Sequence, residues 1–320
     1  MDAVPIDELI LRLIVDELDP LVPRDAAEWF AAYGEQTADL ALPVDRALVA
    51  GLHADRLAWA FAGGYQAAAA ALFGSASSEP PPVGSTRALF ALCATEVGGA
   101  HPRAIASTFR RVGDGWRLDG EKTFVTFGAE AGTLGVVARA GLHDDGRPLL
   151  RVACLPAGRP GISVLPAPSV PFVPEIGHAA LRFDAVAVSD AEMLPGDGYA
   201  DFLRPFRTIE DTHVYAALLG HAMRMARRGW WPEGTRQALL PWVLAARCVA
   251  QADPKAVTTH AALAGLIDAA RALVDGLGPP RAPRDPDVEA RWLRDRPLLD
   301  VAEKARVQRT TAAWWALGSG

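Results

Sequence analysis

A cluster of charged residues interrupts an otherwise apolar helical segment in the second half of the chain. The cluster, RTIEDTH at positions 207–213, holds two adjacent carboxylates, Glu210 and Asp211. A polar group inside a buried helix costs free energy unless it is paired or used in chemistry. Burial raises the pKa of a carboxylate, so that it can act as a general base near neutral pH. The alternative is that Glu210 and Asp211 face solvent or pair with Arg207.

The stretch at positions 91–128 has the pattern of short strands joined by tight turns. It begins in an apolar run that ends at Thr95-Glu96. Farther on, Gly113-Asp114-Gly115 separates two alternating segments, and Asp-Gly in this setting is the strongest short-range signal of a β-hairpin. We expect a second turn at Asp119-Gly120, followed by a strand over 122–126.

Several pieces of this stretch follow one another at a distinctive spacing. They are Thr95-Glu96, Gly98-Gly99, Asp114-Gly115-Trp116, Gly120 with Lys122, and Phe124-Val125-Thr126. Their order and spacing resemble the acyl-CoA dehydrogenase family of flavoproteins, and the chain resembles a short, divergent member. The resemblance is specific because the pieces recur in order, whereas any one of them alone would carry no weight. Two weaker matches follow in the same order, Pro160-Gly161-Ile162 and the strand-like run 181–188.

The resemblance implies a flavin cofactor, with FAD as the first expectation and FMN or no flavin as alternatives. Phe124 would form a flat apolar wall for the flavin ring. Thr126 would place its hydroxyl near the ring nitrogen that receives hydride, and Thr95 would bond the pyrimidine edge. The alternative is that these are ordinary strand residues. The full set of cofactor-binding candidates is Leu92, Ala94, Thr95, Phe124, Val125 and Thr126.

Members of this family also need a carboxylate that removes the substrate's α-proton. Most carry it in a Tyr-Glu-Gly motif before the last helix, and this motif is missing here. The nearest acid is Glu303, although Ala302 fits the position equally well. A minority carry the base on the first long C-terminal helix, ten residues before a glycine, and counting back from Gly220 gives Glu210. Glu210, Glu303 and no catalytic carboxylate at all remain three open alternatives.

The implied activity is oxidation of the α,β-bond of an acyl thioester such as an acyl-CoA. The implied partners are other subunits, in a homo- or hetero-oligomer, and an electron acceptor such as an electron-transfer flavoprotein. Two segments depart from the family pattern: His101-Pro102 replaces an expected Ser-Asp, and 227–234 lacks an expected Arg-x-x-Phe-Gly. The alternative is therefore a non-catalytic member, acting as the partner subunit of a heteromeric dehydrogenase or as a binding scaffold. A flavin-dependent oxidase or monooxygenase of the same fold is a third possibility.

The composition argues against several other classes of protein. A net charge of −6 is unlike that of a nucleic-acid-binding surface. The three cysteines lie far apart in apolar contexts, which is typical of buried thiols in a reducing compartment and gives no metal-binding spacing. The acidic N-terminus differs from a signal peptide, and no apolar run approaches the roughly 18 residues of a membrane span. We expect a cytoplasmic protein with no metal site and no membrane span.

Periodicity divides the chain into three blocks. Helical spacing marks 1–87, short strands between turns mark 88–192, and helical spacing returns over 193–320. The expected fold is α+β and multidomain: an N-terminal helical domain, a middle antiparallel β-barrel or sandwich, and a C-terminal helical bundle. This is the layout that the resemblance implies.

Individual elements can also be predicted. Asp25 should cap a helix over 26–33, and a longer helix over 44–73 should break near Gly63-Gly64. The proline-rich segment 75–85 should be a linker. Further helices are expected over 5–19, 206–228, 241–250, 256–277 and 298–317, and further strands over 105–112, 116–118, 133–140, 149–155, 161–165 and 179–188.

Overall fold

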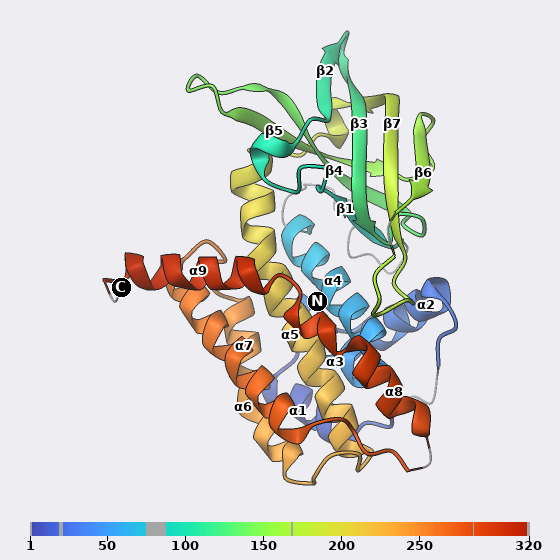
Figure 1. The fold of residues 1–320 in the computed structure, drawn as a ribbon, viewed down its shortest axis with the longest axis vertical. Helices are drawn as coiled ribbons and strands as arrows, with labels where there is room; N and C mark the ends of the chain where they lie inside the picture. The colour runs from blue at the N-terminus through green and yellow to red at the C-terminus, as the bar shows by residue number, and fades with distance from the viewer. Residues whose placement is uncertain (1, 19–21, 75–87, 168, 284, 319–320) are drawn as a thin grey trace. The chain divides into compact units, whose positions relative to one another are not determined.

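The computed structural model describes residues 2–18, 22–74, 88–167, 169–283 and 285–318. The chain forms two compact units (Figure 1). The helical unit comprises Met1–Ala68, Pro171–Glu175 and Arg207–Gly320, and the β unit comprises Ala69–Val170 and Ile176–Phe206. The expected fold class, helical segments on either side of a middle sheet, is confirmed. The predicted linker over 75–85 lies outside the described residues.

Four helices form the N-terminal segment. They are α1 (Ile6–Val15), α2 (Ala26–Gln36), α3 (Pro43–His53) and α4 (Leu57–Phe73). The predicted cap of α2 is confirmed, because Asp25 accepts hydrogen bonds from the backbone N–H groups of Ala27 and Glu28 at 3.0 and 2.9 Å.

The predicted break of the longer helix at Gly63-Gly64 is wrong. The break lies instead at 54–56, between α3 and α4, and both glycines are inside α4. Their function is close packing: a Cβ atom at Gly64 would lie 2.5 Å from Cα of Val214, and one at Gly63 would lie 2.5 Å from Cβ of Ala50. Glycine here lets helix backbones approach each other, although it lowers helix propensity.

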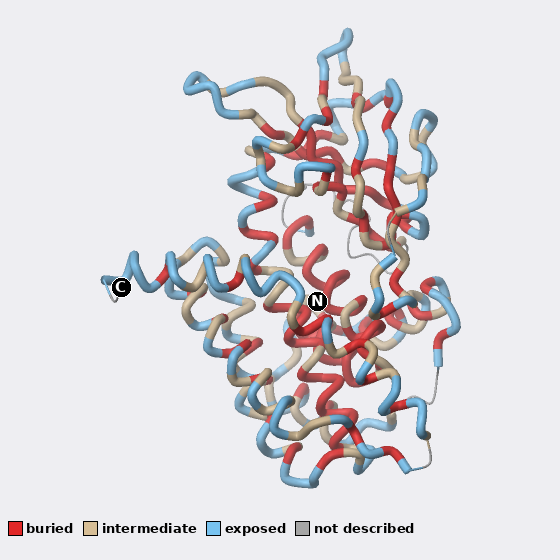
Figure 2. The backbone as a smooth tube through the Cα atoms, in the orientation of Figure 1, coloured by how far each residue is buried: buried red, intermediate tan, exposed pale blue. Residues whose placement is uncertain are grey.

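The C-terminal segment is also helical. The elements are α5 (Arg204–Arg227), α6 (Thr235–Ala250), α7 (Val257–Leu277), α8 (Pro286–Asp295), the 3₁₀ turn η4 (Arg296–Asp300) and α9 (Glu303–Ala316). Helix α8 was not predicted, and the final helix begins at Glu303 instead of residue 298. Within the helical unit α7 packs against α6 and α9, and buried residues concentrate along α3 and the adjoining faces of its neighbours (Figure 2). Among the described helices α7 has the length and apolar composition that a membrane span would need.

The β unit is built on one mixed sheet. Its strands are β1 (Phe90–Cys93), β2 (Thr108–Val112), β3 (Gly115–Thr126), β4 (Thr133–Leu142), β5 (Pro148–Pro156), β6 (Ile162–Pro166) and β7 (His178–Ser189). These described strands follow the order β1-β4-β2-β3-β7-β6, with β5 paired to β4. Most pairings are antiparallel, as expected, but β1 and β2 both run parallel to β4. The predicted hairpin is confirmed, since β2 and β3 pair around Gly113-Asp114 with Val112 opposite Gly115. The short helical turns of this unit are η1 (Pro102–Ala104), η2 (Asp190–Glu192) and η3 (Gly198–Leu203).

The predicted turn at Asp119-Gly120 is wrong, because β3 continues through both residues. A β-bulge lies opposite them on β7, where one extra residue is accommodated between Phe183 and Val186 and Ala185 takes a positive φ of 51°. Gly120 is required by close packing, since a Cβ atom there would lie 2.3 Å from the Ser107 Oγ. The Asp-Gly pair therefore marks a crowded point inside a strand, where bulges and glycines often occur together.

The segment Pro171–Glu175 is fixed to the helical unit by buried polar contacts. Val173 is buried with a positive φ of 42°, a conformation that a β-branched residue rarely adopts. Its backbone N–H donates to the fully buried carboxylate of Asp295 at 2.7 Å. Glu175 accepts from Arg56 at 2.8 Å and from Arg294 at 3.0 Å. These contacts hold the segment in place despite the strain at Val173.

Candidate functional site

A buried ion pair organises the segment that the sequence singled out. The Lys122 ammonium lies 2.7 Å from Oε1 of Glu96 and 2.6 Å from the Val137 carbonyl oxygen. Lys122 is 0% exposed and Glu96 is 7% exposed. Burial opposes ionisation of Glu96, but the charge and the hydrogen bond of Lys122 outweigh it and lower the pKa of the carboxyl. The pair joins the segment after β1 to the middle of β3.

Glu96 also closes the glycine-rich loop that follows it. Its carboxylate accepts from the backbone N–H groups of Ala106 and Ser107 at 2.7 and 3.2 Å. Its own backbone exchanges hydrogen bonds with Gly99 at 3.2 and 2.8 Å. The loop and Lys122 are therefore held by one side chain.

The Glu96 carboxylate accepts from three donors: the Lys122 ammonium and the backbone N–H groups of Ala106 and Ser107. This set leaves Thr95 at a fixed position beside β3. The Thr95 carbonyl oxygen accepts from the Thr123 N–H at 2.9 Å. The predicted threonine therefore lies next to the Phe124-Val125-Thr126 triplet.

A second β-bulge, on β3, sets the direction of the predicted aromatic wall. Leu118 and Lys122 point into the unit, but one extra residue is accommodated between Lys122 and Val125, so that Val125 points inward instead of Phe124. Beyond the bulge Thr126 pairs with His178 on β7. The rings of Phe124 and His178 stack with centroids 4.2 Å apart. Cross-strand partners share a face of the sheet, so Phe124, Thr126 and His178 lie on one face, away from the core.

The hydroxyl groups expected to bind a ligand are available. Within the described residues neither the Thr95 nor the Thr126 hydroxyl has a hydrogen-bond partner, and both residues are half-buried. Polar atoms beside an aromatic ring are what a planar ring with a polar rim requires. The site therefore fits a flavin at these positions.

The other three candidates lie in or next to β1 and β3. Leu92 is half-buried on β1, and Ala94 follows that strand and is buried. Val125 is fully buried in the hydrophobic core of the β unit. The side chains of Ala94 and Val125 are thus used in packing, and the Val125 carbonyl oxygen already accepts from the Gly128 N–H at 3.1 Å.

The two carboxylates on α5 have different environments. Asp211 is ion-paired with Arg309 at 2.6 Å and with Arg306 at 3.6 Å, both on α9. Glu210 is half-buried and has no hydrogen bond or ion pair within the described residues. Burial, reinforced by the charge of Asp211 and opposed by Arg207, raises the pKa of Glu210 to about 7. Glu210 is therefore a carboxylate poised for proton transfer near neutral pH.

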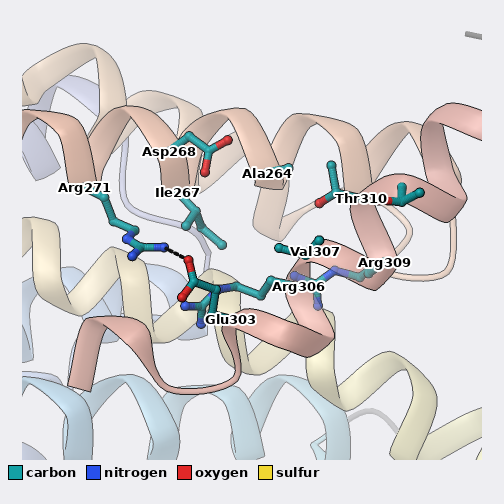
Figure 3. A pocket seen from close by; sticks show the side chains of 10 residues that line it. Ala264, Ile267, Asp268, Arg271, Glu303, Arg306, Val307, Arg309 and Thr310 are labelled. Atoms are coloured by element: carbon teal, nitrogen blue, oxygen red, sulfur yellow. Dashed lines mark hydrogen bonds and ion pairs between the residues drawn. The ribbon is translucent and has the colours of Figure 1, made fainter. Parts of the chain in front are cut away.

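Glu303 is the first residue of α9 and lines a small cavity between α7 and α9 (Figure 3). Its side chain is ion-paired with Arg271 at 3.2 Å and is 53% exposed. The cavity has a volume of about 160 Å³, and Asp268, Arg306 and Arg309 also line it. An exposed, paired carboxylate has less of the character of a general base than Glu210.

The histidines of α5 bond the backbone. His213 Nδ1 lies 2.7 Å from the Ile209 carbonyl oxygen, and His221 Nδ1 lies 2.9 Å from that of Ala54. Burial lowers their pKa values to about 4 and about 3, so that both are neutral near pH 7. In the described part of the chain no group of three or more His, Cys, Asp or Glu side chains could hold a metal ion.

Two contributors were not predicted from the sequence. His178 was not identified, because its contact with Phe124 depends on the bulge in β3. The α9 arginines that pair with Asp211 were also missed, since nothing local connects them to α5. A histidine beside a glycine, as in Gly177-His178, at the beginning of a strand was the one available signal.

Comparison with known proteins agrees with the resemblance found in the sequence. Residues 91–186 match the family model described as acyl-CoA dehydrogenase, middle domain, and a search of curated proteins finds no match. The solved butyryl-CoA dehydrogenase from Megasphaera elsdenii aligns with a TM-score of 0.70 and 16% identity, over 98% of this chain and 100% of that one.

Two other solved structures have the same fold. PigA with FAD and proline aligns with a TM-score of 0.69 and 13% identity, over 98% of this chain and 96% of that one. FMN-bound TdsC from Paenibacillus sp. A11-2 aligns with a TM-score of 0.68 and 15% identity, over 90% of each chain. At these identities the likeness establishes the fold and leaves the reaction open.

Proposed function

We propose that this chain is a divergent member of the acyl-CoA dehydrogenase family and that it oxidises the α,β-bond of an acyl thioester with a flavin. The observation that carries the proposal is the state of Glu210. Its carboxylate is unpaired within the described residues, and its pKa is raised to about 7, while the adjacent Asp211 is ion-paired. A carboxylate used only for stability would be expected to have a partner.

The proposed cofactor is FAD, held by the β unit. Phe124 supports the cofactor as a flat surface, and the free hydroxyls of Thr95 and Thr126 bond its polar rim. Among the structural relatives PigA is described with FAD and TdsC with FMN, so FMN is the other flavin to test. When bound, the flavin supplies a hydride acceptor.

Glu210 takes the proton in the proposed reaction. Its carboxylate removes the α-proton of the acyl group, the electrons of that C–H bond form the double bond, and the β-hydrogen leaves as hydride. A base must be deprotonated to act, so the rate is expected to rise with pH through about 7. Glu303 is the less supported base because Arg271 already pairs with it. We also propose an oligomeric enzyme that passes its electrons to an electron-transfer flavoprotein.

The first experiment is a visible absorption spectrum of the chain purified alone and then with added FAD or FMN. The second follows loss of flavin absorbance when butyryl-CoA and longer acyl-CoAs are added without oxygen. Glu210→Gln should bind flavin normally but slow its reduction by about 10²-fold or more. Glu289→Gln, at an exposed position of α8, serves as a control. Undiminished reduction in the Gln variant would refute the base assignment.

A protein that stays colourless with both flavins would refute the proposed enzyme. The partner-subunit or scaffold interpretation would then be preferred, and binding of acyl-CoA in the absence of flavin would be the next measurement.

A further inference from the structure

The Phe124–His178 stack is unusually close for two rings on neighbouring strands. Their centroids are 4.2 Å apart and their planes meet at 27°, whereas aromatic pairs in proteins usually have centroids about 4.5–7 Å apart. Neither residue contacts another aromatic ring within the described part of the chain. The imidazole therefore covers the Phe124 ring as its single aromatic neighbour there.

Several contacts fix His178 in this position. Thr126 and His178 are cross-strand partners, and the Phe127 N–H donates to the Gly177 carbonyl oxygen at 2.8 Å. Phe127 itself has a positive φ of 59°, which is uncommon for a bulky residue. The end of β3 is thus held against the beginning of β7 by a strained turn, and strain of this kind is often found at functional sites.

The chemistry of the imidazole suits an apolar contact. Burial lowers the pKa of His178, against a hydrogen bond to the Ile176 backbone that raises it. A neutral imidazole can lie against a phenyl ring without bringing an unpaired charge into a half-buried site. His178 is the first residue of β7 and is half-buried, whereas Ala179 and Ala180, which follow it, are buried.

We propose that His178 is a positioning residue that holds Phe124 in place as the flat wall of the flavin site. This inference rests on the proposed function, because the wall has a role only when a flavin binds. His178 acts through Phe124: removing the imidazole would let the phenyl ring rotate away from the face that carries Thr126. A second ring of similar size at position 178 would keep the wall in place.

The test measures the dissociation constants of FAD and FMN by absorbance titration of the full chain. His178→Ala should weaken binding about tenfold, and His178→Phe should restore it to within about twofold of the original. Phe124→Ala should weaken binding at least as much, and adding His178→Ala to that variant should have little further effect, because coupled residues are not additive. His143→Ala, at a histidine of the same unit that faces Asp197, should leave binding unchanged.

The outcomes separate the two proposals. An original chain that binds neither flavin overturns the proposed function and this inference with it. An original chain that binds flavin, together with a His178→Ala variant that binds equally tightly, overturns the inference alone. The inference would also be overturned if His178→Phe failed to restore binding. The same holds if the losses of binding caused by His178→Ala and Phe124→Ala were fully additive in the double variant. If His178→Ala does not fold, His178→Gln, which also removes the ring, takes its place, and flavin binding by that variant as tight as by the original chain would overturn the inference.

Discussion

The Lys122 ammonium and the Glu96 carboxylate lie 2.7 Å apart inside the β unit. Both belong to the ordered set of residues that marked this region in the sequence, yet neither faces the proposed ligand. The pair instead fixes the segment that carries Thr95 against the strand that carries Phe124 and Thr126. Some residues of the sequence motif, such as Lys122 and Glu96, therefore stabilise the structure of the site and do not contact the proposed ligand.

Lys122→Met should strongly destabilise the β unit. The change leaves the Glu96 carboxylate buried without its cation, and removing one partner of a buried pair costs about 3–5 kcal/mol. The measurement is the free energy of unfolding in urea. The double variant Glu96→Gln/Lys122→Met should recover part of the loss, because it removes the uncompensated charge.

The neighbouring pair Glu121–Arg182 is a matched control. It joins β3 to β7 at 3.1 Å but is exposed, and exposed pairs contribute at most about 1 kcal/mol. Glu121→Gln should therefore change stability much less than Lys122→Met. Equal effects of the two substitutions would contradict the structural importance assigned to the buried pair.

Glu210→Gln should change how stability depends on pH. The pKa of Glu210 is about 7 in the fold and 4.5 ordinarily, so the folded state holds the proton more tightly than the unfolded chain. Its contribution to stability is complete below about pH 4.5 and is lost as pH rises through about 7. The original chain should thus lose up to about 3 kcal/mol relative to the Gln variant across this range. Urea unfolding of both proteins between pH 4.5 and 8 gives the comparison, and a difference that does not change with pH would argue against a raised pKa.

Gly64→Ala should destabilise the helical unit. A Cβ atom would lie 2.5 Å from backbone Cα of Val214, and relief of such overpacking costs about 1–3 kcal/mol. Gly265 on α7 is the matched control, since nothing lies within 4 Å of a Cβ atom there. Gly265→Ala should raise stability by about 0.5–1 kcal/mol through helix propensity. Thermal unfolding of the two variants should move in opposite directions.

Asp295→Ala should release the backbone of Val173. The carboxylate is fully buried and accepts the Val173 N–H at 2.7 Å, so its loss leaves a buried donor unsatisfied, at a cost of about 1–3 kcal/mol. Amide hydrogen exchange at residues 171–175 should accelerate together with the loss of stability. Glu289→Ala, at an exposed position of the same helix, should leave exchange in this segment unchanged.

Local chemistry was sufficient to predict several elements from the sequence. The hairpin at Gly113-Asp114 and the cap at Asp25 depend on residues within a few positions, and both were predicted correctly. Gly63-Gly64 and Asp119-Gly120 were misinterpreted for a common reason. A glycine that permits a turn and a glycine that permits close packing look identical in sequence, and Val214 and Ser107, which decide between the two, are distant in the chain.

The candidate site could also be predicted only in part, because residues that are far apart in the sequence complete it. Glu210 was chosen as a candidate base from its position ten residues before Gly220, with support from the charge that interrupts its helix, and this role stays a prediction. The partners of Asp211 lie on α9 and could not be assigned. Strict alternation along β3 would place Phe124 on the same face as Lys122. The bulge between them instead places Phe124 on the opposite face, where its ring contacts His178.

The two bulges of the β3–β7 pair shift the strand register in opposite directions. The extra residue on β7 displaces the pairing by one position, and the extra residue on β3 restores it, so Gly115 meets Ser189 and Thr126 meets His178 in the same frame. The distortion is confined between them. Loss of only one bulge would shift the register at one end of the β3–β7 pair by one residue. We therefore expect the two extra residues to be gained or lost together.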